Sequence, residues 1–408
     1  AYWVGCSTGG RQAMVMSQNF PAYFDGIVAG DPVYDLQAIS LSTVWGVDQI
    51  YDLSPGPYTT VPEPAPEAPA PIIYANFPAS DQTLFETALL QTCDGLDGVA
   101  DGVIDNLPAC LKAFDPATAT YISNGVVYPL QCPAAKDATC LSPAQIQAVM
   151  RINRGPRNAR GQTIEVPAGL QAPDHVDATI EGYQYDAGFM STASIPLRKI
   201  GRPGGAPGDY ALGLNQFPYA WISPPNPSYD PLAFNFGTDL GLLSKATPVV
   251  SYSTSADISK FIARGNKIIW YHGLSDPGPP VLGTILYYRE MAAQHGGIAA
   301  AQRFSRLYLV PNMGHCSGGP ATDQFDMLTP LVQWVENGVS PGPVPATGTN
   351  FTPALYQVDF VPTAPTRTRP LCPYPQEARY TGPTGSGLTA GLASLSNYSC
   401  IMPPAPPH

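Results

Sequence analysis

Apolar runs and amphipathic stretches alternate near the start of the chain. Residues 1–5, AYWVG, form a short apolar run, and residues 24–30, FDGIVAG, form another. Between them, residues 9–21 read GGRQAMVMSQNFP, a pattern typical of a helix that ends before Pro21. A strand, a helix and a strand at this spacing predict one unit of a parallel β-sheet.

The same alternation returns in the second half of the chain. A short helix is expected to begin near Asp257, followed by a strand over residues 267–273 and a helix over residues 281–297. Residues 306–316, RLYLVPNMGHC, indicate a strand that runs into a loop, and residues 325–338 indicate a closing helix. We therefore expect one α/β core assembled from both ends of the chain.

The middle of the chain breaks this pattern. Residues 54–71 are acidic and rich in proline, so they are expected to run extended, as a linker or a covering segment. The irregular region that follows, to about residue 256, is interpreted as an inserted domain. The predicted organisation is a first core part (1–33), an inserted domain (34–256), a second core part (257–345) and a C-terminal covering segment (346–408).

Composition excludes several classes of protein. The chain has 408 residues, of which 44% are hydrophobic and 12% charged, as in a globular protein. Its 20 basic and 31 acidic residues give a formal charge of −11, and no basic run is present, which argues against binding a nucleic-acid backbone. No apolar run approaches the roughly 20 residues that a membrane-spanning helix needs. We therefore expect neither nucleic acid nor membrane as a partner.

Cysteine usage indicates an oxidising compartment. The count of eight is even, and none of the cysteines has the CxxC spacing typical of zinc sites. Glycosylation sequons at Asn350 and Asn397 are consistent with secretion, although such triplets also arise by chance. The sequence has neither an initiator methionine nor a signal peptide, so we expect that it lacks the native start of a secreted protein.

The stretch GCSTG at residues 5–9 fits the pattern G-x-S-x-G. This pattern suits a sharp strand-to-helix turn, in which glycines relieve crowding and the oxygen of Ser7 stands exposed. The backbone amide of Thr8 and the helix N-terminus could then stabilise an oxyanion. An ordinary strand–helix turn is the alternative, but the predicted strand before Ser7 and helix after it favour a nucleophile.

A nucleophilic serine needs a base, and the chain has five histidines. His408 is the terminal residue, His175 lies in a loop, and His295 is more simply a helix cap. His272 ends a predicted strand and could be a buried structural histidine. His315 follows an apolar strand and a turn, which places it at the carboxyl edge of the sheet and makes it the candidate base.

Asp276 is the candidate acid that orients the base. It lies just beyond the predicted strand 267–273, so the chain order becomes Ser7, Asp276, His315, which is the order of α/β-hydrolases. A turn aspartate before Pro277 is the competing interpretation.

Two cysteines adjoin this proposed triad. Cys6 precedes Ser7, and Cys316 follows His315. If the serine and the histidine touch, their neighbours must lie within a few ångströms, and a disulfide between them would fix the geometry of nucleophile and base. Two unrelated free thiols, or Cys6 itself as the nucleophile, are the alternatives; the second would sit one residue away from the tip of the turn.

These residues resemble the tannase and feruloyl esterase family, which also includes the hydrolase of mono(hydroxyethyl) terephthalate. The resemblance is carried by GCSTGG, YHGLSDP and MGHC and extends through FDGIVAG and an aspartate cluster to RPLCPYP. It implies a secreted serine esterase of the α/β-hydrolase fold whose inserted domain is a large lid. It also implies four disulfides: Cys6–Cys316, Cys93–Cys110, Cys132–Cys140 and Cys372–Cys400.

The aspartate cluster CDGLDGVADGVIDN contains the donor type that Ca²⁺ prefers. Asp94, Asp97 and Asp101 alternate with small residues, but their spacing does not fit an EF-hand, and a solvated acidic turn is the simpler interpretation. The resemblance implies a structural calcium in the lid, without a role in the chemistry. It assigns side-chain ligands to Asp94, Asp97 and Asp101, backbone carbonyl ligands to Val99 and Val103, and an outer position to Asp105.

The sequence departs from the family pattern at its start. Only five residues precede Cys6, whereas the family's fold needs several strands, and a loop carrying the second oxyanion donor, before the nucleophile. We therefore expect that the sequence begins inside a longer protein, as a fragment or as part of a processed chain, and that its partner is that missing segment. Residues 1–408 by themselves are predicted to be neither stable nor active.

The predicted activity is hydrolysis of carboxylic esters with an aromatic acyl group, hydroxycinnamoyl or galloyl, through an acyl-serine intermediate. Residues 217–225 and 234–241 are candidate walls of the acyl pocket, although ordinary core is the more probable role for most of them. A terephthalate-type aryl esterase, an acyltransferase or a thioesterase on the same scaffold are the alternatives within enzymes. A non-catalytic, calcium-stabilised secreted binding protein is the alternative outside them.

Overall fold

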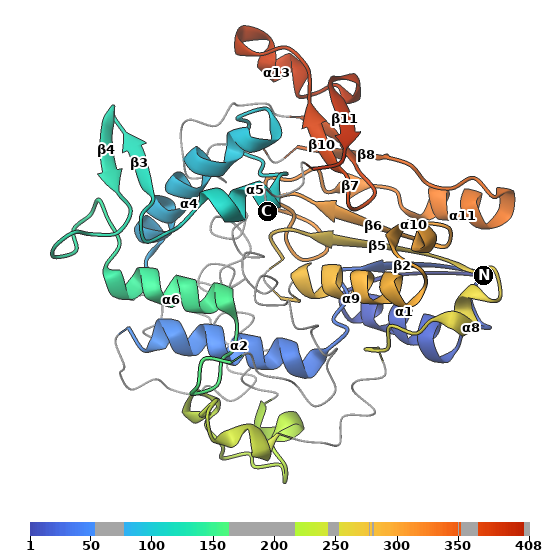
Figure 1. The fold of residues 1–408 in the computed structure, drawn as a ribbon, viewed down its shortest axis with the longest axis horizontal. Helices are drawn as coiled ribbons and strands as arrows, with labels where there is room; N and C mark the ends of the chain where they lie inside the picture. The colour runs from blue at the N-terminus through green and yellow to red at the C-terminus, as the bar shows by residue number, and fades with distance from the viewer. Residues whose placement is uncertain are drawn as a thin grey trace.

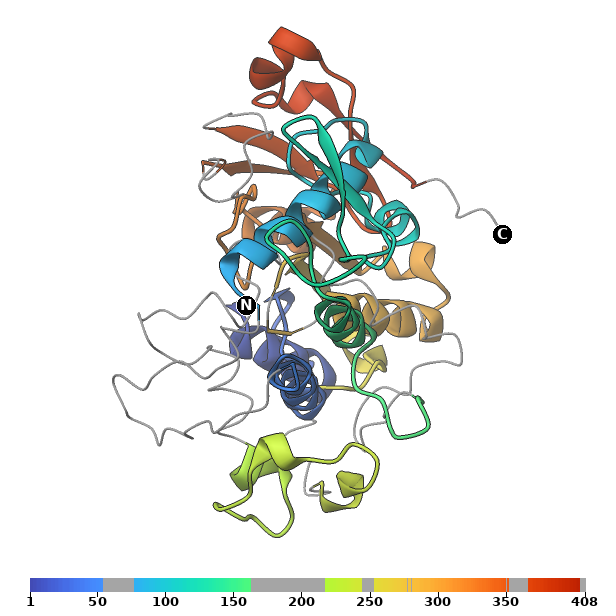
Figure 2. The same cartoon turned by 90° about the vertical axis from the view of Figure 1, so that its left-hand side faces the viewer.

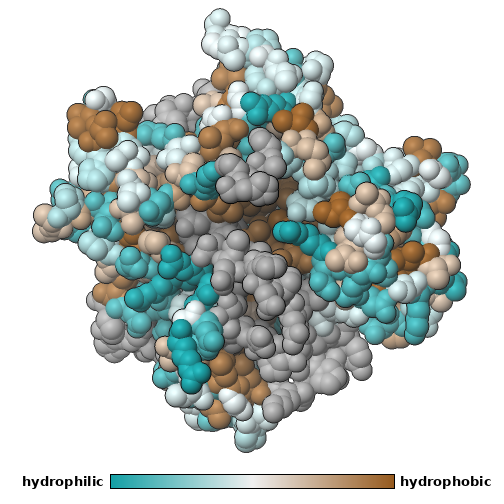
Figure 3. All heavy atoms as spheres, viewed as in Figure 1, coloured by the Kyte–Doolittle hydropathy of each residue, from teal (hydrophilic) through white to brown (hydrophobic). Residues whose placement is uncertain are grey.

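A computed structural model describes most of the chain (Figures 1 and 3). The described residues are 1–53, 77–162, 217–243, 253–276, 278–279, 281–349, 351 and 366–403. The proline-rich segment 54–71 and His175 lie outside them. Within the described part of the chain, no helix combines the length and apolar character needed to cross a membrane.

A four-stranded parallel sheet forms the centre of the fold. Its strands are β1 (Tyr2–Cys6), β2 (Gly26–Gly30), β5 (Lys267–Gly273) and β6 (Ser305–Val310), arranged in the order β1-β2-β5-β6. The prediction of one sheet built from both ends of the chain is thereby confirmed. Since all strands are parallel, their carboxyl ends meet at one edge, where polar residues from distant parts of the sequence come together.

Both faces of this sheet are buried, as is usual for parallel strands. On one face pack α1 (Thr8–Asn19), α8 (Ser259–Ile262), α9 (Val281–Gln294) and α10 (Ile298–Ala301). Alternate strand residues serve this face, such as Ile27 and Ala29 of β2, while Val28 points the other way. The second face is covered by α11 (Leu328–Asn337), through Leu331 and Trp334.

The C-terminal part adds two small antiparallel sheets. Strands β7 (Gln324–Phe325), β8 (Val344–Gly348) and β9 (Arg367–Leu371) form one of them, and β10 (Glu377–Tyr380) pairs with β11 (Tyr398–Ile401) in the other. Residues of β8 and β9 join the core on the α11 face of the parallel sheet. These strands therefore contribute side chains to the core on that face.

The middle of the chain is more helical than its sequence pattern indicates. It forms α2 (Leu36–Tyr51), α4 (Ala79–Cys93), α5 (Leu107–Ala113) and α6 (Pro143–Arg154), and a hairpin of β3 (Thr120–Ser123) and β4 (Val126–Pro129). Helices α2 and α6 lie side by side in both views (Figures 1 and 2). The expectation of an irregular region after residue 71 is wrong for α4, α5 and α6, because these helices pack into an apolar core of their own.

Local capping explains one of these helices. The Oγ of Ser142 accepts the N–H of Gln145 at 3.1 Å, and the side chain of Gln145 accepts the N–H of Ser142 at 2.9 Å. This reciprocal pair satisfies two amides that the first turn leaves open, and Pro143 supplies a suitable φ at the first helical position. The start of α6 is therefore encoded locally.

The predicted pocket segments lie mostly in this second core. Phe217, Trp221, Phe234 and Phe236 are all buried in it, whereas Tyr219 is exposed. Phe217 and Trp221 belong to a π-helical turn, η4 (Phe217–Trp221). Phe234 and Phe236 lie between two 3-10 turns, η5 (Pro231–Ala233) and η6 (Asp239–Leu242). Ordinary core is thus the role of these four aromatic residues. The remaining short elements are η1 (Asp94–Asp97), η8 (Gly385–Gly387), α13 (Leu388–Gly391) and η9 (Leu395–Asn397).

Candidate active site

Ser7 occupies a strained turn between β1 and α1. Its backbone has φ 62° and ψ −121°, a conformation that an L-residue rarely adopts. Close packing around the turn requires glycine, since a Cβ on Gly5 would lie 2.7 Å from the Gly9 backbone, and one on Gly10 would lie 2.2 Å from the Gly30 carbonyl oxygen. The turn therefore has the geometry that the G-x-S-x-G pattern predicts.

Thr8 is exposed and is the first residue of α1. Amides in the first turn of a helix have no acceptor within the helix, and the helix dipole adds partial positive charge there. The backbone N–H of Thr8 thus belongs to the group of donors expected to face an oxyanion near Ser7.

Asp276 and His315 meet at the same edge of the sheet. The Oδ2 of Asp276 lies 2.7 Å from the Nδ1 of His315, and the N–H of Gly278 donates to Oδ1 at 2.8 Å. Asp276 is buried, while 28% of the His315 side chain remains exposed. Burial by itself raises the pKa of Asp276, but hydrogen bonds from His272 and His315 outweigh it and hold that pKa below the ordinary value.

The disulfide Cys6–Cys316 ties the serine turn to the histidine loop. The two Cα atoms are 6.0 Å apart, although 310 residues separate them in sequence. Because Ser7 follows one cysteine and His315 precedes the other, this bond brings the nucleophile and the base to the same place. Two free thiols are thereby ruled out for this pair, since the described chain has no free cysteine.

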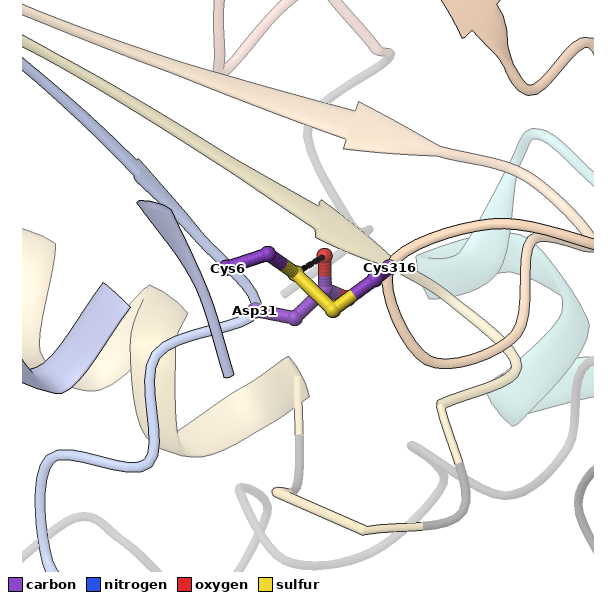
Figure 4. A group of neighbouring side chains, drawn as sticks. All are labelled: Cys6, Asp31 and Cys316. Atoms are coloured by element: carbon purple, nitrogen blue, oxygen red, sulfur yellow. Dashed lines mark hydrogen bonds between the residues drawn. A yellow bond between two sulfur atoms is a disulfide. The ribbon is translucent and has the colours of Figure 1, made fainter. Parts of the chain in front are cut away.

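Asp31 lies beneath this disulfide and was not found by sequence reasoning (Figure 4). It directly follows β2, is fully buried, and has a positive φ of 38°. Its Oδ1 accepts the N–H of Gly273 at 2.9 Å, and its Oδ2 lies 3.5 Å from the Sγ of Cys6. Burial raises the pKa of Asp31 to about 8. In the sequence it reads as a turn residue before proline, so no local signal distinguishes it.

His272 is the structural histidine that the sequence allowed. It is fully buried, with Nδ1 2.8 Å from the Oγ1 of Thr284 and Nε2 3.0 Å from the carbonyl of Pro279. Its Nε2 also lies 3.4 Å from Asp276 and 3.8 Å from Asp31. Burial lowers the pKa of His272, but the Asp31 and Asp276 carboxylates more than compensate and raise it overall. A ring so enclosed supports Asp276 and cannot reach a substrate.

The aspartate loop is buried beside two arginines. Asp94, Asp97 and Asp101 are each at most 3% exposed. The guanidinium of Arg369 lies 3.3 Å from Asp97 and 3.4 Å from Asp101, and it donates to Asp105 at 3.0 Å. The other predicted calcium ligands and the second arginine are also buried: Val99, Val103 and Arg367.

The carboxylate oxygens of this loop are engaged by backbone donors as well. Asp94 accepts the amides of Asp101 and Gly102, Asp97 accepts that of Val99, and Asp101 accepts that of Val103. Among the described residues, two groups of side chains have potential metal-ligand atoms that all lie within 4.8 Å of one another. These groups are Cys6–Asp31–Cys316 and Asp31–His272–Asp276. The aspartate loop is not one of them.

Three further disulfides match those that the family resemblance implies. They are Cys93–Cys110, Cys132–Cys140 and Cys372–Cys400, with Cα separations of 5.0, 5.0 and 5.6 Å. The first closes the aspartate loop onto α5, and the last joins β9 to β11. Asn397 is half-buried and its amide donates to the Gly391 carbonyl at 2.9 Å, while Asn350 lies outside the described residues. Glycosylation at either position stays a prediction.

Comparison with known proteins places this architecture in a family. Mono(2-hydroxyethyl) terephthalate hydrolase of Piscinibacter sakaiensis is 37% identical over 425 residues, covering 99% of this chain and 64% of the relative. The chain thus spans slightly less than two thirds of the length of that relative.

Solved structures share the fold. Feruloyl esterase B of Aspergillus oryzae matches with a TM-score of 0.62 at 22% identity, covering 98% of this chain and 68% of the other. Tannin acyl hydrolase of Aspergillus niger matches with a TM-score of 0.63 at 19% identity, covering 99% of this chain and 64% of the other. The family model described as tannase and feruloyl esterase matches residues 1–401, and the chain therefore belongs to the tannase and feruloyl esterase family.

Proposed function

We propose that the protein containing this chain is a secreted serine hydrolase of carboxylic esters, with an α/β-hydrolase core and a large lid. The observation that carries this proposal is the 2.7 Å contact between Asp276 and His315, at the sheet edge to which the Cys6–Cys316 disulfide ties Ser7. A strained serine, an oriented imidazole and a helix N-terminus form the constellation that acyl transfer needs.

In the proposed reaction, His315 removes the proton of Ser7 as its Oγ attacks the ester carbonyl carbon. The resulting oxyanion accepts the Thr8 amide, and collapse of the intermediate releases the alcohol, which takes the proton from His315. Water then attacks the acyl-serine, with His315 again acting as base, and the acid leaves. Asp276 keeps Nδ1 of His315 protonated and stabilises the imidazolium in both steps.

The proposed substrates are esters of aromatic acids. The names of the relatives support this, since they specify a terephthalate monoester, feruloyl esters and tannin. The choice among hydroxycinnamoyl, galloyl and terephthaloyl groups is left to experiment.

The activity test uses the full-length natural protein with methyl ferulate, methyl gallate and mono(2-hydroxyethyl) terephthalate in plain buffer, and a Ser7→Ala variant as control. Hydrolysis of one ester that is lost in the control supports the proposal and selects the acyl group. Turnover that needs an added alcohol or thiol acceptor indicates an acyltransferase. No turnover, and no labelling of Ser7 by a fluorophosphonate in folded protein, favours a non-catalytic binding protein and overturns the proposal.

The proposal includes a structural Ca²⁺ in the aspartate loop, held by Asp94, Asp97 and Asp101 and by the carbonyls of Val99 and Val103. Charge supports it: the loop carries four acidic side chains, Asp94, Asp97, Asp101 and Asp105, against the two guanidinium groups of Arg367 and Arg369, so acidic groups outnumber basic ones there. Uncompensated buried charge is costly, and a divalent cation with oxygen ligands would balance it. When bound, the ion stabilises the lid.

Thermal unfolding in calcium and in a chelator tests the metal site. Free Ca²⁺ at a hundred times its dissociation constant should stabilise the protein by about 2.7 kcal/mol. Asp101→Asn should abolish this response, whereas Asp137→Asn, at an exposed position elsewhere in the lid, should preserve it. Equal unfolding temperatures of the unmodified protein in calcium and in chelator would show that the loop is a cation-free salt-bridge cluster.

Secretion is proposed from the disulfides. Four of them join all eight cysteines of the chain, as is typical of proteins that mature in an oxidising compartment. Recovery of the natural protein from the culture medium or the periplasm, with no thiol titrated by a maleimide after denaturation, would support this location.

A further inference from the structure

The loop that carries His315 is held at three points. The disulfide at Cys316 ties its end to Cys6. The carbonyl of Met313 accepts the N–H of Ser275 at 2.9 Å, which joins the loop to the neighbour of Asp276. The third point is Asn312, whose Nδ2 donates to the carbonyl of Gly102 at 2.6 Å. The first two contacts lead to the proposed triad, but the third leads out of it, into the aspartate loop.

Asn312 is shaped for this contact. It is fully buried, its φ is 58°, and asparagine is among the few residues that tolerate this left-handed conformation. The same Nδ2 lies 3.3 Å from the carbonyl of Pro320, which follows His315 in the chain. One amide group therefore contacts both the aspartate loop and the chain that follows His315. Because Nδ2 is buried and contacts two carbonyl oxygens, the side chain of Asn312 is held in one position.

Gly102 is itself fixed by the aspartate loop. Its N–H lies 2.9 Å from Oδ1 and 2.8 Å from Oδ2 of Asp94, the first of the aspartates in the loop. A chain of contacts therefore runs from the Asp94 carboxylate, through the Gly102 peptide, to the side chain of Asn312. Only Met313 and Gly314 separate Asn312 from His315 in sequence.

We infer that Asn312 is a positioning residue for the proposed esterase reaction: it fixes the His315 loop against the aspartate loop and thereby sets where the base stands. The inference rests on the proposed function, because it concerns the residue that acts as base there. Loss of the anchor frees one side of the loop while the disulfide still holds the other, so His315 shifts relative to Ser7 and Asp276. A displacement of about 1 Å can reduce the reaction rate about a hundredfold without removing any reacting group.

The test compares two variants of Asn312 with a matched control in the full-length natural protein. Asn312→Gly tolerates the positive φ, and Asn312→Asp keeps the shape; both lose the Nδ2 donor. Asn266→Ala is the control, because Asn266 is also buried and donates to a distant carbonyl, that of Pro21, at 2.8 Å, but at the opposite end of β5. Each protein is assayed for kcat, KM, the rate of labelling by a fluorophosphonate, and thermal unfolding.

We expect both Asn312 variants to lower kcat and the labelling rate together by at least about tenfold, with KM changed by less than about twofold. Asn266→Ala should lower the unfolding temperature comparably and leave both rates near those of the unmodified protein. A folded Asn312→Gly or Asn312→Asp protein with kcat within twofold of normal overturns the inference. If the unmodified protein shows neither turnover nor labelling, the proposed function itself fails, and the inference fails with it.

Discussion

One carboxylate oxygen of Asp276 lies between two imidazoles. It accepts a hydrogen bond from Nδ1 of His315 at 2.7 Å, and it lies 3.4 Å from Nε2 of His272, which is hydrogen-bonded to the carbonyl of Pro279. Only the first ring reaches solvent, since His272 is fully buried. The second ring supports the carboxylate from behind. Because Asp276 contacts the partly exposed ring of His315, its substitution should lower the catalytic rate, which the substitution of a purely structural buried acid would not do.

Asp276→Asn should leave the protein folded and lower kcat by about 10⁴, because an amide can present its N–H₂ to Nδ1 of His315 and select the wrong tautomer. The measurement is kcat and KM on the ester found in the substrate test. Asp257→Asn, at an exposed position just before α8, is the control and should keep full activity. Activity of Asp276→Asn within tenfold of normal would falsify the assignment of Asp276 as the orienting acid.

Removal of the Cys6–Cys316 bond should damage activity as well as stability. In the loop-entropy model, a closed loop of 310 residues contributes about 5–6 kcal/mol to the free energy of unfolding, and one of 8 residues about 2–3 kcal/mol. The double variant Cys6→Ala/Cys316→Ala should therefore lose more stability than Cys132→Ala/Cys140→Ala.

The distinguishing measurement is activity at a temperature where both double variants are folded. The first should lose most of its kcat, because Ser7 and His315 are no longer tied together, while the second should keep nearly all of it. Equal activities would mean that the triad is held by packing alone and that the disulfide serves stability only.

Sequence reasoning identified the parallel sheet and the proposed triad because each has a local signal. Strands β1, β2, β5 and β6 are short apolar runs, and the doublets Cys6–Ser7 and His315–Cys316 mark two distant turns as neighbours. The alternation of these segments with amphipathic stretches was enough to join the two ends of the chain in one sheet.

Other features have no such signal. Helix α4 buries three polar residues, Asp81, Gln82 and Glu86, so its polar positions do not mark its exposed face. Asp31 and Asn312 both stand in turn sequences, and their importance arises from tertiary contacts with Gly273 and Gly102. Contacts over more than 200 residues cannot be read from the local pattern of polarity.

The helical middle of the chain can be weakened at one defined place, the start of α6. Ser142→Ala removes the acceptor of the Gln145 amide and should lower the free energy of unfolding by about 1 kcal/mol. Chemical denaturation followed by circular dichroism measures this loss, with Ser399→Ala, an exposed strand residue, as the control. Catalytic constants should not change, because α6 packs against α2. A loss no larger than that of the control would show that Pro143 and packing alone define the helix start.

The raised pKa of Asp31 predicts how the stability of the protein depends on pH. Burial raises its pKa from an ordinary value of 3.8 to about 8, so the folded state binds a proton that the unfolded state releases. The stability that comes from neutral Asp31 is complete below about pH 4 and is lost as the pH rises toward 8. An amide side chain at this position cannot ionise, so Asp31→Asn should be nearly neutral at pH 5 and stabilising, by about 1–3 kcal/mol, at pH 8.

The control, Asp257→Asn, is expected to change the stability of the protein in the opposite direction. Hydrogen bonds from Ser259 lower the pKa of Asp257, so its contribution is present above about pH 4 and Asp257→Asn should slightly destabilise the protein at both pH 5 and pH 8. Urea unfolding of both variants at the two pH values measures the difference. If Asp31→Asn is instead more destabilising at pH 8 than at pH 5, then Asp31 is ionised in the folded protein and His272 carries the compensating charge 3.8 Å away.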